Sequence, residues 1–215
     1  MGLGTFLDAI KIWVEGLISS MGYPGLGLVM FLENIFPPIP SEVVLPLAGS
    51  LTLIGTFNLA WVTIVGMSGS ILGALVFYGL GRWLGEKRVR DIIARFGKYA
   101  MLTTNDFDTS LNWFNRYGEW VIFFGRMVPI VRSLISIPAG VASMNMARFL
   151  VLTAFGTALW SFVLSLGGRL LGSQWHLVVD FIDQYQKIVL VAGILVVIGF
   201  ILYRLRGRIL KSTQA

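Results

Sequence analysis

The sequence predicts an all-α integral membrane protein whose two halves form an inverted repeat. Of the 215 residues, 56% are hydrophobic and 13% are charged, whereas about 25% are charged in an ordinary soluble domain. Some segments are apolar over about the 20 residues that a membrane-spanning helix needs. Two proline-rich stretches, FLENIFPPIPSEVVLPLAG (31–49) and FFGRMVPIVRSLISIPAG (123–140), carry charges inside apolar sequence. Together these observations favour broken helices within a membrane.

Residues 1–20 are expected to form an amphipathic helix in the membrane interface. Asp8, Lys11 and Glu15 recur at helical spacing on one side, and the other side is apolar. These charges interrupt the apolar run, and no basic region precedes it, so the segment does not resemble a cleaved signal peptide.

Three later segments, 59–81, 147–168 and 188–203, are expected to span the membrane as helices. Residues 25–57 and 120–146 are too interrupted to cross it. Each is expected to form a re-entrant hairpin, two half-helices that enter and leave on the same face. The residues expected to shape the hairpin backbone are Pro37, Pro40, Pro129 and Gly140.

The order of these segments indicates an internal repeat of hairpin followed by span. Ala48-Gly49 matches Ala139-Gly140, and Gly81-Arg82 matches Gly168-Arg169. Because a hairpin stays on one face and a span changes face, the two hairpins would enter from opposite sides. Sites in such inverted repeats lie near the midplane, where the halves meet.

The distribution of basic residues predicts the orientation. Residues 82–119 are expected to form amphipathic helices on the cytoplasmic face, and the C-terminus is expected on that face too. These two regions hold most of the basic residues: Arg82, Lys87, Arg88, Arg90, Arg95, Lys98, Arg116, Arg204, Arg206, Arg208 and Lys211. The net charge of +6 therefore favours contact with anionic lipid head groups over nucleic acid.

Four charged residues, Glu33, Glu42, Arg126 and Arg132, lie within the two hairpins at related places. Such a residue costs about 2.5 to 3.5 kcal/mol to insert into a membrane. One interpretation is that each reaches water near a hairpin mouth, or that they only neutralise one another. The other is that the arginines bind an anion such as phosphate, while the glutamates carry protons or act as counter-ions.

The stretch FGRMVPIVRSLISIPAGVASMNMARF resembles the signature of the DedA family, a family related to lipid scramblases that have a VTT domain. The matching positions are Phe124, Arg126, Pro129, Arg132, Ala139, Gly140, Met144 and Phe149. The segment with Glu33 and Glu42 resembles the family's acidic hairpin, although the place of the second acid varies. The resemblance covers nearly the whole chain.

The resemblance implies a multi-pass protein of the bacterial inner membrane that moves undecaprenyl phosphate from the outer to the inner leaflet. Proton entry through the glutamates could offset the membrane potential that opposes inward movement of the phosphate. No enzyme activity, cofactor or metal is expected, and the chain has no cysteine.

Other functions stay open at this point. They are non-selective phospholipid scrambling, proton-coupled cation antiport, and a lipid phosphatase, for which His176 is the sole histidine. The small residues Gly66, Ser68, Gly69, Ser70 and Gly73 permit helix packing within or between subunits, so a homo-oligomer also stays open.

Overall fold

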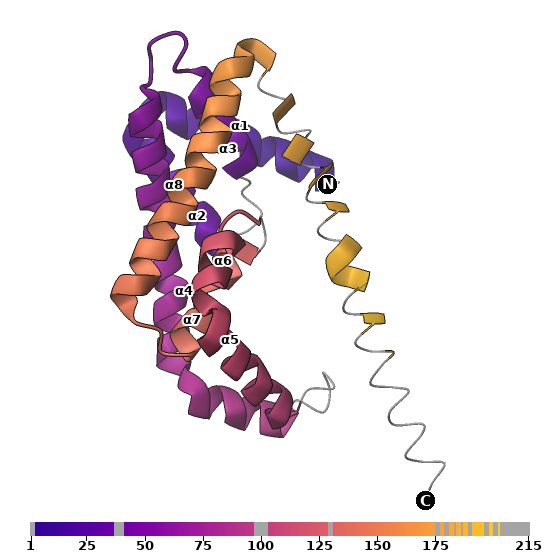
Figure 1. Ribbon diagram of the computed structural model, residues 1–215. Helices are drawn as coiled ribbons and strands as arrows, with labels where there is room; N and C mark the ends of the chain where they lie inside the picture. The colour runs from indigo at the N-terminus through magenta and orange to yellow at the C-terminus, as the bar shows by residue number, and fades with distance from the viewer. Residues whose placement is uncertain are drawn as a thin grey trace, which may run out of the picture.

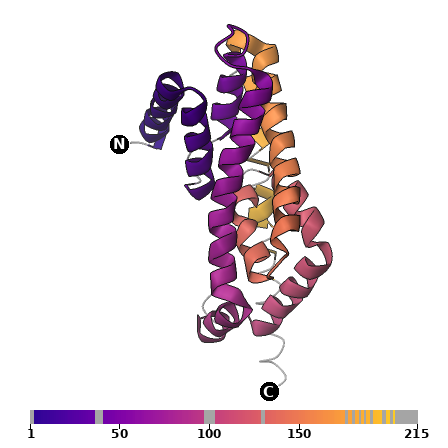
Figure 2. The same cartoon turned by 90° about the vertical axis from the view of Figure 1, so that its left-hand side faces the viewer.

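A computed structural model describes residues 3–36, 41–96, 103–128 and 131–174, together with short pieces between residues 177 and 202. The described residues form helices joined by turns, without a strand. Two of the helices, α4 (Leu59–Phe96) and α8 (Met146–Leu171), are long and apolar enough to cross a membrane. They lie side by side and set the long axis of the molecule (Figures 1 and 2).

The helix α4 is longer than the predicted span 59–81. It stays helical through residues 82–96 and bends at Gly85, where φ is 63° and ψ is 168°. A φ in this range is accessible to glycine without the steric penalty that other residues pay. The basic, amphipathic part of the sequence therefore continues directly from the apolar part as a bent extension of α4.

The first half of the chain begins with α1 (Leu3–Met21), α2 (Tyr23–Ile35) and α3 (Ser41–Ser50). The helix α1 points away from the two long helices and contacts α2 (Figure 2). Val14 and Ile18 are buried in this contact. The helix α3 runs through Pro46 to Ser50, so the chain is less interrupted here than the sequence suggested.

The second half contains α5 (Thr104–Gly125), α6 (Val131–Leu134) and α7 (Ser136–Val141), followed by α8. The helix α5 is continuous across residues 119 and 120, where the sequence predicts the change from the cytoplasmic helices to the second hairpin. A capping box starts this helix: Thr103 Oγ1 accepts from the backbone N–H of Asp106, and Asp106 accepts from the backbone N–H of Thr103. The polar and apolar parts of the segment thus share one helix.

The two halves pack on each other through equivalent glycines. A Cβ atom placed on Gly49 would lie 2.0 Å from the carbonyl oxygen of Ser165 in α8, and one placed on Gly140 would lie 2.1 Å from that of Tyr78 in α4. The reverse contacts are equally close: a Cβ on Gly168 would lie 2.0 Å from Pro46 O, and one on Gly81 would lie 2.2 Å from Ile137 O. The helix α3 of the first half therefore packs on α8 of the second half, and α7 of the second half packs on α4 of the first.

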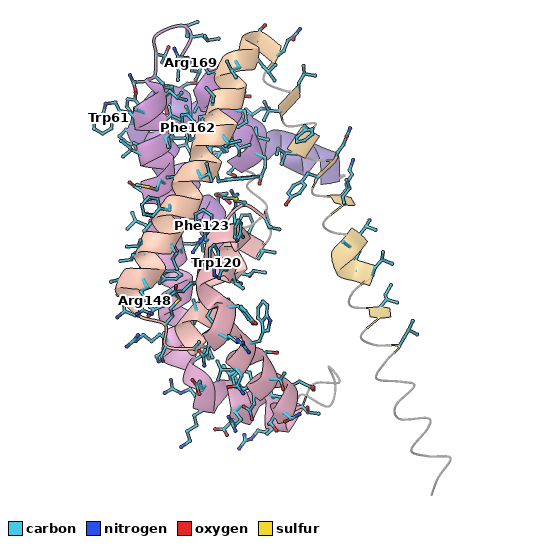
Figure 3. The ribbon with its side chains drawn as sticks, viewed as in Figure 1. Trp61, Trp120, Phe123, Arg148, Phe162 and Arg169 are labelled. Atoms are coloured by element: carbon cyan, nitrogen blue, oxygen red, sulfur yellow. The ribbon has the colours of Figure 1, made fainter. Side chains whose placement is uncertain are left out.

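Large apolar side chains cover the outer surface of α8 and of the part of α4 that precedes Arg82. Trp61 and Phe162 project from α4 and α8, and Arg148 and Arg169 lie near the two ends of α8 (Figure 3). The arginines are separated by about 30 Å along the helix, given a rise of about 1.5 Å per residue. This distance is close to the hydrocarbon thickness of a bilayer, about 30 Å.

Some predicted features lie outside the described residues. They are the hairpin prolines Pro37, Pro40 and Pro129, the sole histidine His176, and much of the predicted span 188–203. The pieces of 188–203 that the structure describes are helical.

Candidate functional site: a buried cluster of four charges

The structure brings the four hairpin charges together in the interior, although they come from four different segments. Glu33 lies in the last turns of α2, Glu42 in the first turn of α3, Arg126 at the end of α5, and Arg132 in α6. Their exposed fractions are 2%, 2%, 2% and 7%. The alternative in which each residue reaches water near a hairpin mouth does not describe this arrangement.

Arg132 joins the two halves of the chain. Its guanidinium donates a hydrogen bond to Glu33 Oε1 and another to Ser41 Oγ. The carboxylate of Glu42 lies 3.7 Å from the same guanidinium, as an ion pair without a hydrogen bond. Both buried acids therefore share one arginine, and Glu33 is held more tightly than Glu42.

Arg126 has only neutral acceptors among the described residues. It donates to the backbone carbonyl of Arg132 at 2.8 Å, to Ser136 Oγ at 2.9 Å and to Thr153 Oγ1 at 3.2 Å. Its guanidinium carbon lies 5.7 Å from the centroid of the Phe149 ring. The Nε–H of Arg126 is buried and has no hydrogen-bond partner in the described part of the chain. Arg126 is thus a buried guanidinium that forms no ion pair with a carboxylate in the described part of the chain.

The packing defines which residues of the two halves are equivalent. Gly69 in α4 and Gly156 in α8 hold corresponding places relative to the paired glycines. A Cβ on Gly69 would lie 3.0 Å from Met30 Cβ, and one on Gly156 would lie 3.0 Å from Arg126 Cβ. Met30, and not Glu33, is therefore the counterpart of Arg126. Glu33 and Arg126, which the sequence places similarly relative to Pro37 and Pro129, therefore differ by three residues in the packing, which is about one helical turn.

The neutral partners of the arginines were not among the residues predicted for the site. Ser41 and Ser136 lie within the two proline-rich stretches, and Thr153 is buried in α8. A signal for Thr153 exists, because it begins a series of hydroxyl residues spaced by four along an apolar helix. Gly140, which was expected to shape the second hairpin, lies at the crossing of α7 and α4.

The described residues contain no group of three or more histidine, cysteine, aspartate or glutamate side chains placed to hold a metal ion. The chemistry of the cluster is instead that of guanidinium groups, carboxyl groups and hydroxyls. Such a set can bind an anion through N–H donors and can exchange protons at the carboxyl groups.

These features define an all-helical protein with two long apolar helices and a buried charge cluster between two equivalent halves. The sequence matches the VTT domain over residues 39–170. The chain belongs to the VTT-domain family of membrane proteins, the DedA family that its sequence resembled.

Three relatives illustrate the range of names within this family. The undecaprenyl phosphate transporter A of Staphylococcus aureus is 35% identical over 87% of this chain and 92% of its own length. The protein of the same name in Bacillus subtilis is 32% identical over 97% of this chain and 100% of its own length. An alkaline phosphatase-like protein of Lactococcus lactis is 38% identical over 87% of this chain and 88% of its own. No solved structure shows significant similarity to the chain.

Proposed function

We propose that the chain transports undecaprenyl phosphate across the bacterial cytoplasmic membrane, from the outer to the inner leaflet, without chemical change. The observation that carries the proposal is the buried guanidinium of Arg126, whose hydrogen-bond partners in the described part of the chain are all neutral. A phosphate oxygen is a stronger acceptor for a guanidinium than a hydroxyl or a carbonyl group. The names of two relatives supply the identity of the lipid.

In this proposal α4 and α8 span the membrane, and the two pairs of shorter helices are re-entrant hairpins that meet at its centre. The cytoplasmic face is the one that carries residues 82–119 and the C-terminus, because these regions are rich in basic residues. The phosphate occupies the charge cluster, and the polyprenyl tail stays in the surrounding lipid. Only the head group then needs a polar path.

The charge balance of the cluster supports proton coupling. With all four groups ionised, two glutamates and two arginines sum to zero. A phosphate monoester adds about −1.5 to −2 charges, and an uncompensated buried charge is costly. Protonation of Glu33 and Glu42 restores neutrality and releases Arg132 from its ion pairs. Inward movement of the complex would then carry protons with the phosphate, so the proton-motive force would drive it.

Flipping of fluorescent polyprenyl phosphate in proteoliposomes tests the proposal. Arg126→Gln removes the buried cation, and we expect flipping to fall at least tenfold. Arg148→Gln is the matched control, because Arg148 is an exposed arginine of the same half, paired with Glu119 at 3.1 Å. We expect wild-type flipping from this control. Wild-type flipping from Arg126→Gln would contradict the proposal.

Two further measurements separate the rival functions. Equal flipping of glycerophospholipid, without competition from polyprenyl phosphate, would identify a non-selective scramblase. Release of inorganic phosphate from labelled lipid would identify the enzyme that the name of the Lactococcus relative suggests. An imposed proton gradient should accelerate wild-type flipping, and we expect Glu33→Gln to remove this acceleration.

A further inference from the structure

The helix α8 buries four hydroxyl residues, and among the described contacts only Thr153 is bound to a residue of the charge cluster. Thr153, Thr157, Ser161 and Ser165 recur every four residues, and none is more than 6% exposed. Residues four apart in an α-helix lie one above the other. This hydroxyl series therefore extends over about 18 Å, from Arg126 toward the end of α8.

The two serines of the series differ from the two threonines in their hydrogen bonds. Thr153 accepts from Arg126, and the hydroxyl of Thr157 donates to the carbonyl of Thr153. In contrast, Ser161 Oγ and Ser165 Oγ are buried without a hydrogen-bond partner among the described residues. A helical serine can use the carbonyl four residues earlier, as Ser68 does at 2.8 Å on the exposed side of α4. Buried hydroxyl groups without such a partner are commonly satisfied by internal water.

The serines lie beside the face of α3 that carries Glu42. Ser161 Oγ would lie 3.4 Å from a Cβ placed on Gly66, and Leu45 Cδ2 would lie 3.1 Å from the same atom. The backbone of Ser165 touches Gly49. In α3, Leu45 follows Glu42 by three residues and Gly49 follows Leu45 by four, so all three share one face of the helix. The hydroxyl series and this face of α3 form a seam that leads from Ser165 to Glu42.

A further buried oxygen, that of Glu42, lies at the inner end of this seam. Glu42 Oε1 has no hydrogen-bond partner in the described part of the chain. The charged groups that face it are Arg132, at 3.7 Å, and Glu33, which binds the same guanidinium. The seam between α3 and α8 thus contains three buried oxygens that have no hydrogen-bond partner among the described residues.

The equivalent positions of α4 do not form such a series. The equivalent positions are found by counting back from Gly168 in α8 and from Gly81 in α4. They are Tyr78 for Ser165, Ala74 for Ser161, Ser70 for Thr157 and Gly66 for Thr153. Tyr78 donates to the carbonyl of Met144 at 2.5 Å, and its ring stacks on Phe149 at 4.6 Å. The polar seam is therefore a feature of one half and not a consequence of the repeat.

We propose that the seam between α3 and α8 holds a file of water molecules that connects the end of α8 near Ser165 with Glu42. Water is the ligand that satisfies all three oxygens, since it both donates and accepts hydrogen bonds. The file gives protons a route to the buried acids from the face opposite residues 82–96. Its role in proton delivery rests on the proposed transport function, whereas its presence does not.

Cysteine scanning tests the hydration directly, because the chain has no cysteine of its own. Ser161→Cys and Ser165→Cys are close in size to serine. Each variant is placed in lipid nanodiscs, where both faces are accessible, and exposed to Ag⁺, which replaces the thiol proton and releases it to water. After unfolding in detergent, a maleimide counts the thiols that did not react.

The matched control is Leu164→Cys, since Leu164 is 1% exposed and lies in the apolar core beside the seam. We expect both serine positions to react with Ag⁺ at least tenfold faster than the control. Equal slow reaction at all three positions would overturn the proposal, because it would show a dry seam. Equal fast reaction would overturn it too, because water would not be confined to the seam.

A functional measurement addresses proton delivery. The double variant Ser161→Ala and Ser165→Ala removes two hydroxyls from the seam and leaves Arg126 in place. We expect the acceleration of flipping by a proton gradient to fall at least fivefold, with binding of polyprenyl phosphate retained. Unchanged acceleration would overturn the proton route. If the wild-type chain flips no lipid, the proposed function fails, and the Ag⁺ rates still decide whether the seam is hydrated.

Discussion

The two halves of the chain share a backbone arrangement and differ in the chemistry that they bring to its centre. Gly49 packs against α8 in the same way that Gly140 packs against α4. A Cβ placed on either glycine would lie at nearly the same distance from a main-chain oxygen of that helix. The first half contributes two acids to the centre, whereas the second contributes two arginines. The position equivalent to Arg126 is an apolar methionine, Met30.

This difference gives the two buried arginines different partners. Arg132 binds both acids of the other half, so its loss would strand two buried carboxylates. Arg126 binds neutral oxygens of its own half, so it contributes less to holding the halves together, and in the proposed function its charge is available to an anion. The common backbone determines where the charges meet, and the unequal side chains determine what can bind there.

The largest expected effect on stability comes from Arg132→Met. Removal of one partner of a buried ion pair typically costs about 3 to 5 kcal/mol, because the remaining charge is buried without compensation. We expect a loss of this size in the free energy of unfolding, measured in detergent micelles. The triple variant that adds Glu33→Gln and Glu42→Gln should recover part of it. If Arg132→Met were as stable as wild type, the ion pairs of Arg132 with Glu33 and Glu42 would not hold the halves together.

The second effect tests the symmetry of the backbone. Gly140→Ala and Gly49→Ala would each place a methyl group about 2 Å from a main-chain oxygen of the opposite long helix. Because main chain must move, we expect each variant to lose about 1 to 3 kcal/mol, as in overpacked cores. Gly79→Ala is the control, since a Cβ there meets nothing within 4 Å, and alanine favours the helix by up to about 1 kcal/mol. Unequal losses at the two crossings would break the comparison between the halves.

Much of the architecture could be predicted because periodicity and apolar length are local properties. The sequence indicated helices throughout, the two long apolar helices α4 and α8, and the glycine pairs at which the halves cross. The family could also be predicted, because its signature is contiguous in the sequence. The ends of α4 and α5 were less predictable, since a bend at Gly85 and a capping box at Thr103 depend on local backbone geometry.

The partners inside the charge cluster could not be predicted from spacing. Ser41 contacts Arg132 across 91 residues of sequence, and Thr153 contacts Arg126 across 27. The difference between the two arginines also depends on three-dimensional packing. In the sequence they flank the same proline and look interchangeable, yet only Arg132 reaches the acids.

The third prediction concerns Arg126→Met, which gives the second half the residue that the first half has at the equivalent position, Met30. The variant gives up three hydrogen bonds but also removes a buried cation, so we expect the free energy of unfolding to change by no more than about 1 kcal/mol. Binding of polyprenyl phosphate, measured by native mass spectrometry, should fall at least tenfold. Destabilisation as large as that of Arg132→Met would assign Arg126 a structural role instead.

The smallest effect is expected at a charge pair that is exposed. Arg148 and Glu119 lie 3.1 Å apart, with side chains 71% and 58% exposed. Such pairs contribute about 0 to 1 kcal/mol, because water screens them and ordering two long side chains costs entropy. A double-mutant cycle with Arg148→Gln and Glu119→Gln should give a coupling energy of no more than about 0.5 kcal/mol. The cycle for Arg132 and Glu33 should give several times more. Similar values in the two cycles would mean that burial does not distinguish the central cluster from a surface pair, and the argument that Arg132 joins the halves would lose its physical basis.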